Sequence, residues 1–173
     1  MHRAAMLTSL LAAGASLAAC KPSAAPSAQH TGSASESVDA YGPDAKPGVT
    51  AGAARLVLPV VPGRPGVVYF RIANMSKTRI TLAGVHVDGI GHAEMHRTTG
   101  SAMKPVDHVD IAPGASIAFA PGGLHAMAFD IGGRLKAGGQ SELTLTFADG
   151  DKTSLPLKIE AMGASDGMAG MSH

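Results

Sequence analysis

The sequence predicts one all-β domain built as an antiparallel β-sandwich. Short apolar runs alternate with Gly- and Pro-rich turns, apolar and polar residues alternate near the C-terminal end, and no stretch shows a helical period. The 173 residues suffice for one ordinary domain plus tails. Because the apolar face of a half-buried strand needs a second sheet to cover it, about seven or eight such strands imply a sandwich.

The expected strands follow one another between residues 51 and 161. Apolar runs predict strands at Val67–Ile72, Arg79–Val87, Ala93–Thr99, Met103–Ile111, Ile117–Ala120 and Leu124–Ile131. The clearest pair comes last, because apolar and polar residues alternate over residues 143–147 and again over 155–159. Asp149-Gly150 between these two runs is typical of a hairpin turn.

Composition and charge exclude several classes of protein. Charged residues make up 16% of the chain and Trp is absent, so Val, Ile, Leu and Met must supply most of the core. Removing residues 1–19 removes Arg3 and no acid, which leaves 13 basic against 13 acidic residues and a formally neutral chain. A neutral chain is unsuited to binding nucleic acid or strongly charged partners.

The N-terminus predicts export. A basic start, Met1-His2-Arg3, precedes the apolar run Met6–Ala19, which is too short to span a membrane. The run ends in Leu17-Ala18-Ala19-Cys20, which resembles the lipobox of bacterial lipoproteins. We therefore expect a lipid-modified Cys20 after a signal peptide at residues 1–19, although a secreted protein with a chance Cys is an alternative. The residue after the Cys is Lys21, whereas Asp at this position would favour retention in the inner membrane. We therefore expect a periplasmic protein that is anchored in the outer membrane.

The remaining chain divides into three expected segments. Residues 20–50 are rich in Ser, Ala, Pro and Gly and predict a flexible linker. Residues 51–161 form the β-sandwich domain, and residues 162–173 form a flexible tail. Since Cys20 is the only Cys, the domain has no disulfide, thiolate zinc site, thiol nucleophile or Cys-ligated blue-copper centre.

Four neutral metal donors stand out in the domain. His125 and Met127 are separated by one residue and so share one face of a strand. His96 and Met103 lie on two expected strands joined by a short loop, so they can face each other across a hairpin. Imidazole and thioether together suit Cu(I) and suit Mg²⁺, Ca²⁺ or Zn²⁺ poorly. The alternative for each residue is ordinary packing, because strand Met residues commonly fill cores.

These residues lie within segments that resemble the periplasmic copper chaperones of the PCu(A)C family. The similar segments are Tyr69–Asn74, Ala93–His96, Met103–Val106, Ile111–Gly114 and Pro121–Met127. Twenty-one residues separate Met103 from the His125-Ala126-Met127 motif, as in that family. The resemblance covers residues 52–159, most of the expected domain.

The resemblance implies a cupredoxin-like, immunoglobulin-like sandwich that binds one Cu(I) through His96, Met103, His125 and Met127. It further implies a monomeric carrier that delivers copper to the CuA site in subunit II of cytochrome c oxidase, or to another chaperone serving it. Such a protein needs no nucleophile or general acid, so we do not expect an enzyme. The membrane is contacted through the lipid anchor, and no nucleic acid is involved.

One departure from the family pattern concerns the spacing before Met103. Only six residues separate it from His96, where the family has about ten. Because the difference is even, removing two residues from each arm of a hairpin keeps both side chains on one face. We therefore expect the site to survive, with His92 as a lower-ranked substitute for His96.

The tail offers a second, weaker candidate site. Its donors are Met162, Met168, Met171 and His173. They could capture copper, including Cu(II), or close over the main site; an incidental set of residues in a disordered tail is the alternative. We expect His30, His86 and His108 to be surface or structural residues, and Met75 and Met95 to be packing residues.

Two other functions share part of this interpretation. A copper-buffering or resistance protein would use the same Cu(I) site without an oxidase acceptor. A metal-free structural lipoprotein would tolerate replacement of every candidate ligand.

Overall fold

The computed structural model describes residues 45–163. The expected signal peptide, Cys20, His30 and the tail residues Met168, Met171 and His173 lie outside the described residues. Between residues 45 and 163 the chain forms ten β-strands and no α-helix. No helix in this part is long and apolar enough to cross a membrane. The prediction of an all-β fold is confirmed.

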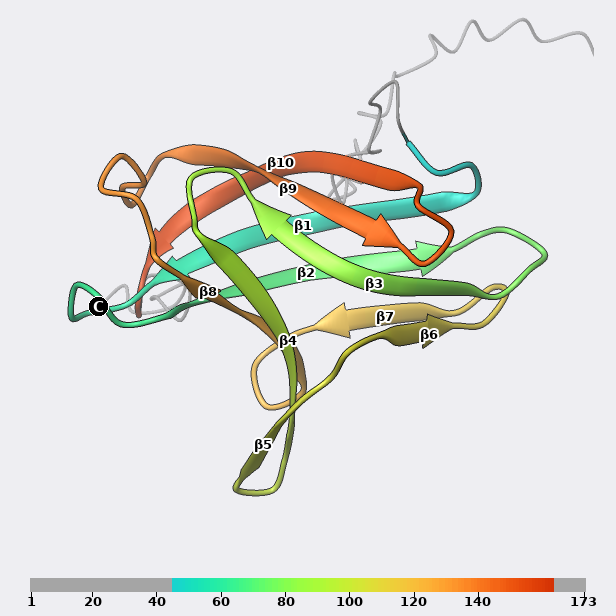
Figure 1. The fold of residues 1–173 in the computed structure, drawn as a ribbon, viewed down its shortest axis with the longest axis horizontal. Helices are drawn as coiled ribbons and strands as arrows, with labels where there is room; N and C mark the ends of the chain where they lie inside the picture. Colours follow the sequence, from blue (N-terminus) through green and yellow to red (C-terminus); the bar gives the residue numbers. More distant parts are fainter. Residues whose placement is uncertain (1–44, 164–173) are drawn as a thin grey trace, which may run out of the picture. The chain divides into compact units, whose positions relative to one another are not determined.

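The strands have the following bounds: β1 Val49–Leu58, β2 Gly66–Asn74, β3 Ile80–Val87, β4 His92–Thr99, β5 Ala102–Pro105, β6 Val109–Ile111, β7 Ser116–Phe119, β8 Leu124–Phe129, β9 Gln140–Phe147 and β10 Lys152–Ala161. They are hydrogen-bonded in the order β5-β4-β8-β7-β2-β1-β10-β9-β3-β6, and β8 also pairs with β2. The sheet curls so that its two halves pack face to face around a shared core (Figure 1). Most pairs are antiparallel, whereas β1 and β10 run parallel.

Alternation along the strands builds the core. Over residues 143–147 of β9 and 153–159 of β10 every second residue is buried, and the apolar inward positions are Leu143, Leu145, Phe147, Leu155, Leu157 and Ile159. This is the pattern read from the sequence, and Asp149-Gly150 forms the turn between the two strands. Phe70 and Phe119 stack at the centre with 4.2 Å between ring centroids. The core is thus mostly aliphatic, with a few phenylalanines.

The prediction of a single strand over Met103–Ile111 was wrong. The structure divides this run into β5, which pairs with β4, and β6, which pairs with β3. β5 and β6 are the two edge strands of the sheet, so the chain leaves one edge and crosses to the other over residues 106–108. Pro105 is the last residue of edge strand β5, where proline is tolerated because its missing N–H is not needed for pairing: the backbone N–H of Val106 still donates to the carbonyl oxygen of Met95 at 2.8 Å.

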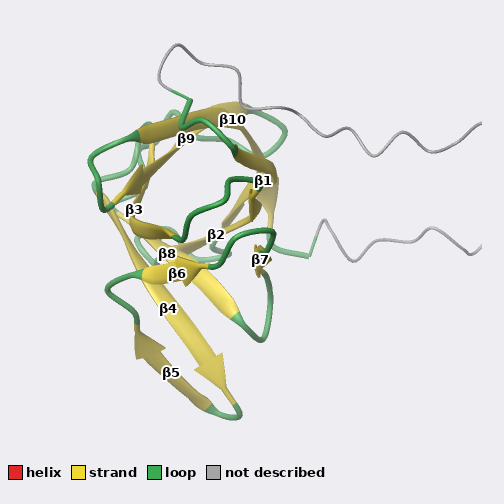
Figure 2. Cartoon of the chain, turned by 90° about the vertical axis from the view of Figure 1, so that its right-hand side faces the viewer, coloured by secondary structure: helices red, strands yellow, loops and turns green. Residues whose placement is uncertain are grey.

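The β4–β5 hairpin extends beyond the ring of strands that surrounds the core (Figure 2). All four residues of β5 are exposed. The inner half of β4 remains part of the core, since Met95 is buried there. Side chains on this hairpin are therefore attached to a strand that packs on the core at one end, and they remain reachable from solvent.

Lys46 fastens the chain to the β9–β10 hairpin just before β1. Its ammonium group forms ion pairs with Asp149 and with Asp151, the latter at 2.8 Å, and lies 5.4 Å from the centre of the Phe147 ring. Its backbone N–H donates to Oγ1 of Thr153 at 3.1 Å. The hydrogen bond from Lys46 lowers the pKa of Asp149, and the bonds to Asp149 and Asp151 raise the pKa of Lys46. Lys46 and the start of β1 at Val49 belong to the range expected to be linker.

We predict that Lys46→Met lowers the melting temperature by a few degrees at neutral pH, because both ion pairs are lost. The lowered pKa of Asp149 makes its contribution complete above the ordinary carboxyl range, and this contribution disappears as pH falls through the folded-state value. The raised pKa of Lys46 means that its own contribution is lost only at alkaline pH. Thermal melts of wild type and variant should therefore begin to converge below about pH 5 and should coincide only once the pH falls below the lowered pKa of Asp149. The exposed Lys152→Met is the control, and an equal pH dependence in both variants would contradict the prediction.

Candidate metal-binding face

Strand register brings the four candidate ligands to one face of the sheet. His96 on β4 lies directly opposite His125 on β8, and Met127 follows His125 by two residues. Thr98 follows His96 by two residues and lies opposite Met103 on β5. Because opposed residues in an antiparallel pair point to the same side, and residues two apart do likewise, all four side chains share one face. We call this surface of β5, β4 and β8 the His/Met face.

The opposite face of the same strands belongs to the core. Met95, Ala126 and Ala128 are buried there, with Met95 opposite Ala126. Their apolar packing determines which side of β4 and β8 turns inward. The His/Met face consequently points away from the core, and its two imidazole rings lie 5.9 Å apart, centre to centre.

Met103 does not lie directly across from His96, as the sequence interpretation allowed. Pro105 occupies that position, and Met103 is displaced by two residues towards the tip of the hairpin. Residues in such a diagonal relation are about 7–8 Å apart at their Cα atoms, a gap that a long side chain can cover. Met103 is therefore on the expected face, although its placement relative to His96 differs from a directly opposed pair.

Exposure rises across the face from β8 to the tip of the hairpin. His125 is only 6% exposed, the His96 side chain 16%, and Met103 53%, while Met127 is half-buried. The histidine side chains are thus largely enclosed, whereas Met103 can be reached by another molecule. This arrangement suits a site whose bound ion is later transferred to another molecule.

The His125 ring is oriented by the backbone. Its Nδ1 lies 3.0 Å from the carbonyl oxygen of Gly123, which also accepts the backbone N–H of Thr98 at 3.0 Å. Since a carbonyl oxygen only accepts, Nδ1 carries the proton in the neutral ring and Nε2 then keeps its lone pair. Nε2 of His125 is thus the nitrogen available to a metal.

The His96 ring is oriented by a carboxylate that the sequence interpretation did not identify. Nε2 of His96 lies 3.3 Å from Oε2 of Glu94, and Nδ1 is buried without a hydrogen-bond partner. The spacing of two residues between Glu94 and His96 on one strand could have revealed this contact from the sequence. A buried nitrogen without a partner is uncommon and is relieved when a cation binds it.

The donor chemistry on this face fits a soft metal ion. Among residues 45–163, no group of three or more His, Cys, Asp or Glu could hold a metal ion. A site on the His/Met face would therefore need the thioethers of Met103 and Met127 in addition to the two imidazoles. Two neutral imidazoles with two thioethers form a donor set that Cu(I) accepts readily.

The other candidate residues lie elsewhere or have different contacts. His92 shares the face, but it stacks on Phe129 at 4.7 Å and lies 3.8 Å from both Glu94 and Asp130. Met95 is buried, as expected for a packing residue, whereas the same expectation for Met75 was wrong because its side chain is 69% exposed just after β2. His86 and His108 are exposed surface residues, as expected.

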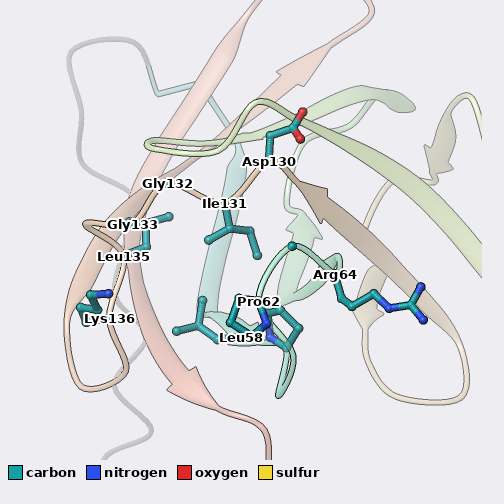
Figure 3. A pocket seen from close by; sticks show the side chains of 11 residues that line it. Leu58, Pro62, Arg64, Asp130, Ile131, Gly132, Gly133, Leu135 and Lys136 are labelled. Atoms are coloured by element: carbon teal, nitrogen blue, oxygen red, sulfur yellow. The ribbon is translucent and has the colours of Figure 1, made fainter.

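A separate pocket of about 280 Å³ lies where the β1–β2 and β8–β9 connections meet. Leu58, Pro62, Ile131 and Leu135 line it together with polar residues (Figure 3). None of the four candidate ligands contributes to its lining. The pocket is therefore distinct from the His/Met face.

Comparison with known proteins agrees with the fold. A sequence profile of the LpqE-like lipoprotein family matches residues 48–159. No curated protein sequence matches the chain significantly.

Several solved structures are similar in fold. The copper-bound PCuAC domain from PmoF2 has a TM-score of 0.57 at 21% identity and covers 66% of this chain and 93% of that one. The apo PCuAC domain from PmoF1 has a TM-score of 0.56 at 25% identity, covering 66% and 94%. CuI-DR1885 from Deinococcus radiodurans has a TM-score of 0.56 at 22% identity, covering 70% and 83%. These similarities confirm the expected cupredoxin-like, immunoglobulin-like β fold.

We predict a small effect on stability for the exposed methionine of the hairpin and a large loss for the buried one. Met103→Leu should change the free energy of unfolding by less than about 0.5 kcal/mol, because Met103 has little packing to lose. Met95→Ala should cost about 2–5 kcal/mol, because it leaves a cavity in the core. Urea unfolding of the metal-free protein measures both. A large loss from Met103→Leu would indicate a packing role for this residue and would count against its role as a ligand.

Proposed function

The chain belongs to the LpqE-like lipoprotein family, and from this premise we propose that it carries one Cu(I) ion outside the cytoplasm on its His/Met face. His96, Met103, His125 and Met127 are the proposed ligands. The observation that supports the proposal most directly is the pairing of His96 with His125 on a face that also presents both thioethers. Two structures of similar fold, the PCuAC domain from PmoF2 and DR1885, are copper-bound and CuI forms respectively, which is consistent with this assignment.

We propose that the protein is a carrier that delivers copper and is not an enzyme. The proposed acceptor is the CuA site of cytochrome c oxidase subunit II, or another copper chaperone that serves this oxidase. Exposed Met103 at the projecting hairpin offers an acceptor a first point of ligand exchange. Thioether ligands stay neutral across the physiological pH range, so they bind Cu(I) without releasing protons. The protein itself is proposed to act as a monomer.

The lipid anchor determines where the carrier works. Cys20 is the proposed lipidation site, and the outer membrane of a periplasm-containing cell is the proposed location because Lys21 follows the Cys. Twenty-five residues lie between Cys20 and Lys46, which is tied to the β9–β10 hairpin. A flexible linker of this length has a root-mean-square reach of roughly 30 Å, enough to let the domain meet a partner.

The tail donors are proposed as an auxiliary copper site. Ala161 at the end of β10 pairs with Leu58, and Met162 immediately beyond it is exposed. Met127 lies at the same end of the sheet, since it pairs with Val67 and Val67 pairs with Val57. With strands about 4.8 Å apart, β10 is only roughly 15 Å from β8, so ten further residues suffice to reach the His/Met face.

We predict one-to-one Cu(I) binding by the soluble domain without Cys20 and the residues before it. Competition with a Cu(I) chelator under anaerobic conditions measures the affinity. Met103→Leu/Met127→Leu should weaken binding on the order of a hundredfold, or about 2.7 kcal/mol. Met75→Leu, an equally conservative change at an exposed Met, is the matched control. Unchanged affinity in the double variant would refute the proposed site, and no binding at all would favour a structural lipoprotein.

A deletion strain separates delivery from buffering. If the protein delivers copper to the oxidase, deletion should reduce oxidase activity under copper limitation, and wild-type protein should restore it while the double variant should not. If it buffers copper, deletion should instead reduce tolerance to copper excess. Loss of tolerance with full oxidase activity would contradict the proposed acceptor while leaving the Cu(I) site intact.

A further inference from the structure

Glu94 occupies the middle of the His/Met face. It lies directly opposite Met127 and precedes His96 by two residues, so its side chain stands among the proposed ligands. Its Oε2 is 3.3 Å from Nε2 of His96, and its Oε1 is 3.8 Å from Nε2 of His92. His92 in turn is stacked on Phe129. The carboxylate is thus placed between two histidines, one of them a proposed ligand.

The contact with Glu94 determines which nitrogen of His96 carries the proton. An ionised carboxylate can only accept, so Nε2 of a neutral His96 must be the protonated nitrogen. The lone pair then resides on Nδ1, which is buried and has no hydrogen-bond partner. Leaving such a buried acceptor unpaired is unfavourable, and a metal ion bound at Nδ1 would remove this cost.

His125 shows the reverse arrangement. Its Nδ1 donates to the carbonyl oxygen of Gly123, which leaves the lone pair on Nε2. The two opposed rings therefore offer different nitrogens, Nδ1 from His96 and Nε2 from His125. Backbone orients one ring and a side chain orients the other, and only the second can be changed by a single substitution.

We propose that Glu94 is a positioning residue that holds His96 as the Nε2–H tautomer and so presents Nδ1 to copper. This inference rests on the proposed function, because it assigns a role at the same site. Glu94 itself is not a ligand. Outer carboxylates that orient ligating histidines in this way commonly change metal affinity by about 10–100-fold when removed.

Three variants test the assignment. Glu94→Ala removes the acceptor, and Glu94→Gln keeps an acceptor oxygen without the charge. Asp130→Asn is the matched control, because Asp130 contacts His92 at 3.8 Å and no contact joins it to His96. Asn also tolerates the left-handed backbone at this position, where φ is 53°.

Two measurements follow on each variant. Long-range proton–nitrogen correlation spectra of the metal-free protein, recorded where His96 is neutral, report its tautomer. We expect Nε2–H in wild type, Glu94→Gln and Asp130→Asn, and a mixture in Glu94→Ala. Chelator competition should show Cu(I) binding about 10–100-fold weaker in Glu94→Ala, with wild-type affinity in Asp130→Asn and recovery of most of the loss in Glu94→Gln.

The outcomes that overturn the inference differ from those that overturn the proposed function. A wild-type protein that binds Cu(I) but shows His96 as a mixture of tautomers would refute the role of Glu94 alone. So would Glu94→Ala with an altered tautomer and unchanged affinity. A wild-type protein with the Nε2–H tautomer and no Cu(I) binding would refute the proposed function, and with it the presentation of Nδ1 to copper.

Discussion

The register between β4 and β8 is the constraint on which the candidate site depends. It places His96 opposite His125, Glu94 opposite Met127, and Met95 opposite Ala126. A shift of one residue would exchange the faces of β4, putting Glu94 and His96 into the core and Met95 into solvent. The apolar packing of Met95 against the core therefore maintains the register, and the same register assembles the polar face. Fold stability and site geometry rest on the same strand pair.

The Gly123 carbonyl connects this register to ligand orientation. It accepts both the N–H of Thr98 on β4 and the Nδ1–H of His125. Strand pairing and ring orientation are thus held by one backbone oxygen, and this leaves His125 buried and fixed. At the other end of the face, Met103 sits on an edge strand of four exposed residues. A site that is rigid at one end and open at the other suits retention of a metal ion followed by ligand exchange, provided that the His/Met face binds copper as proposed.

The donor set matches the chemistry that the composition leaves available. The described domain contains no Cys, so a soft metal would have to be held by thioether and imidazole groups. Neutral ligands would leave the positive charge on the metal alone, and the Glu94 carboxylate lies close enough to His96 to offset part of it. The same carboxylate explains why the two histidines, although directly opposed, differ in the nitrogen that remains free.

Local patterns in the sequence determined a large part of this protein. Alternation predicted β9 and β10 with the Asp149-Gly150 turn, and the spacing of His125 and Met127 placed them on one face, because side-chain direction along a strand follows from the backbone alone. The break between β5 and β6, the position of Pro105 opposite His96 and the exposure of Met75 were decided by the tertiary structure. Each depends on which strands pair and where the sheet ends, and these are properties of segments distant in sequence. The contact between Glu94 and His96 depends on both levels. Their spacing along one strand allows the contact, but only the pairing of β4 with β8 places both side chains beside His125 and Met127.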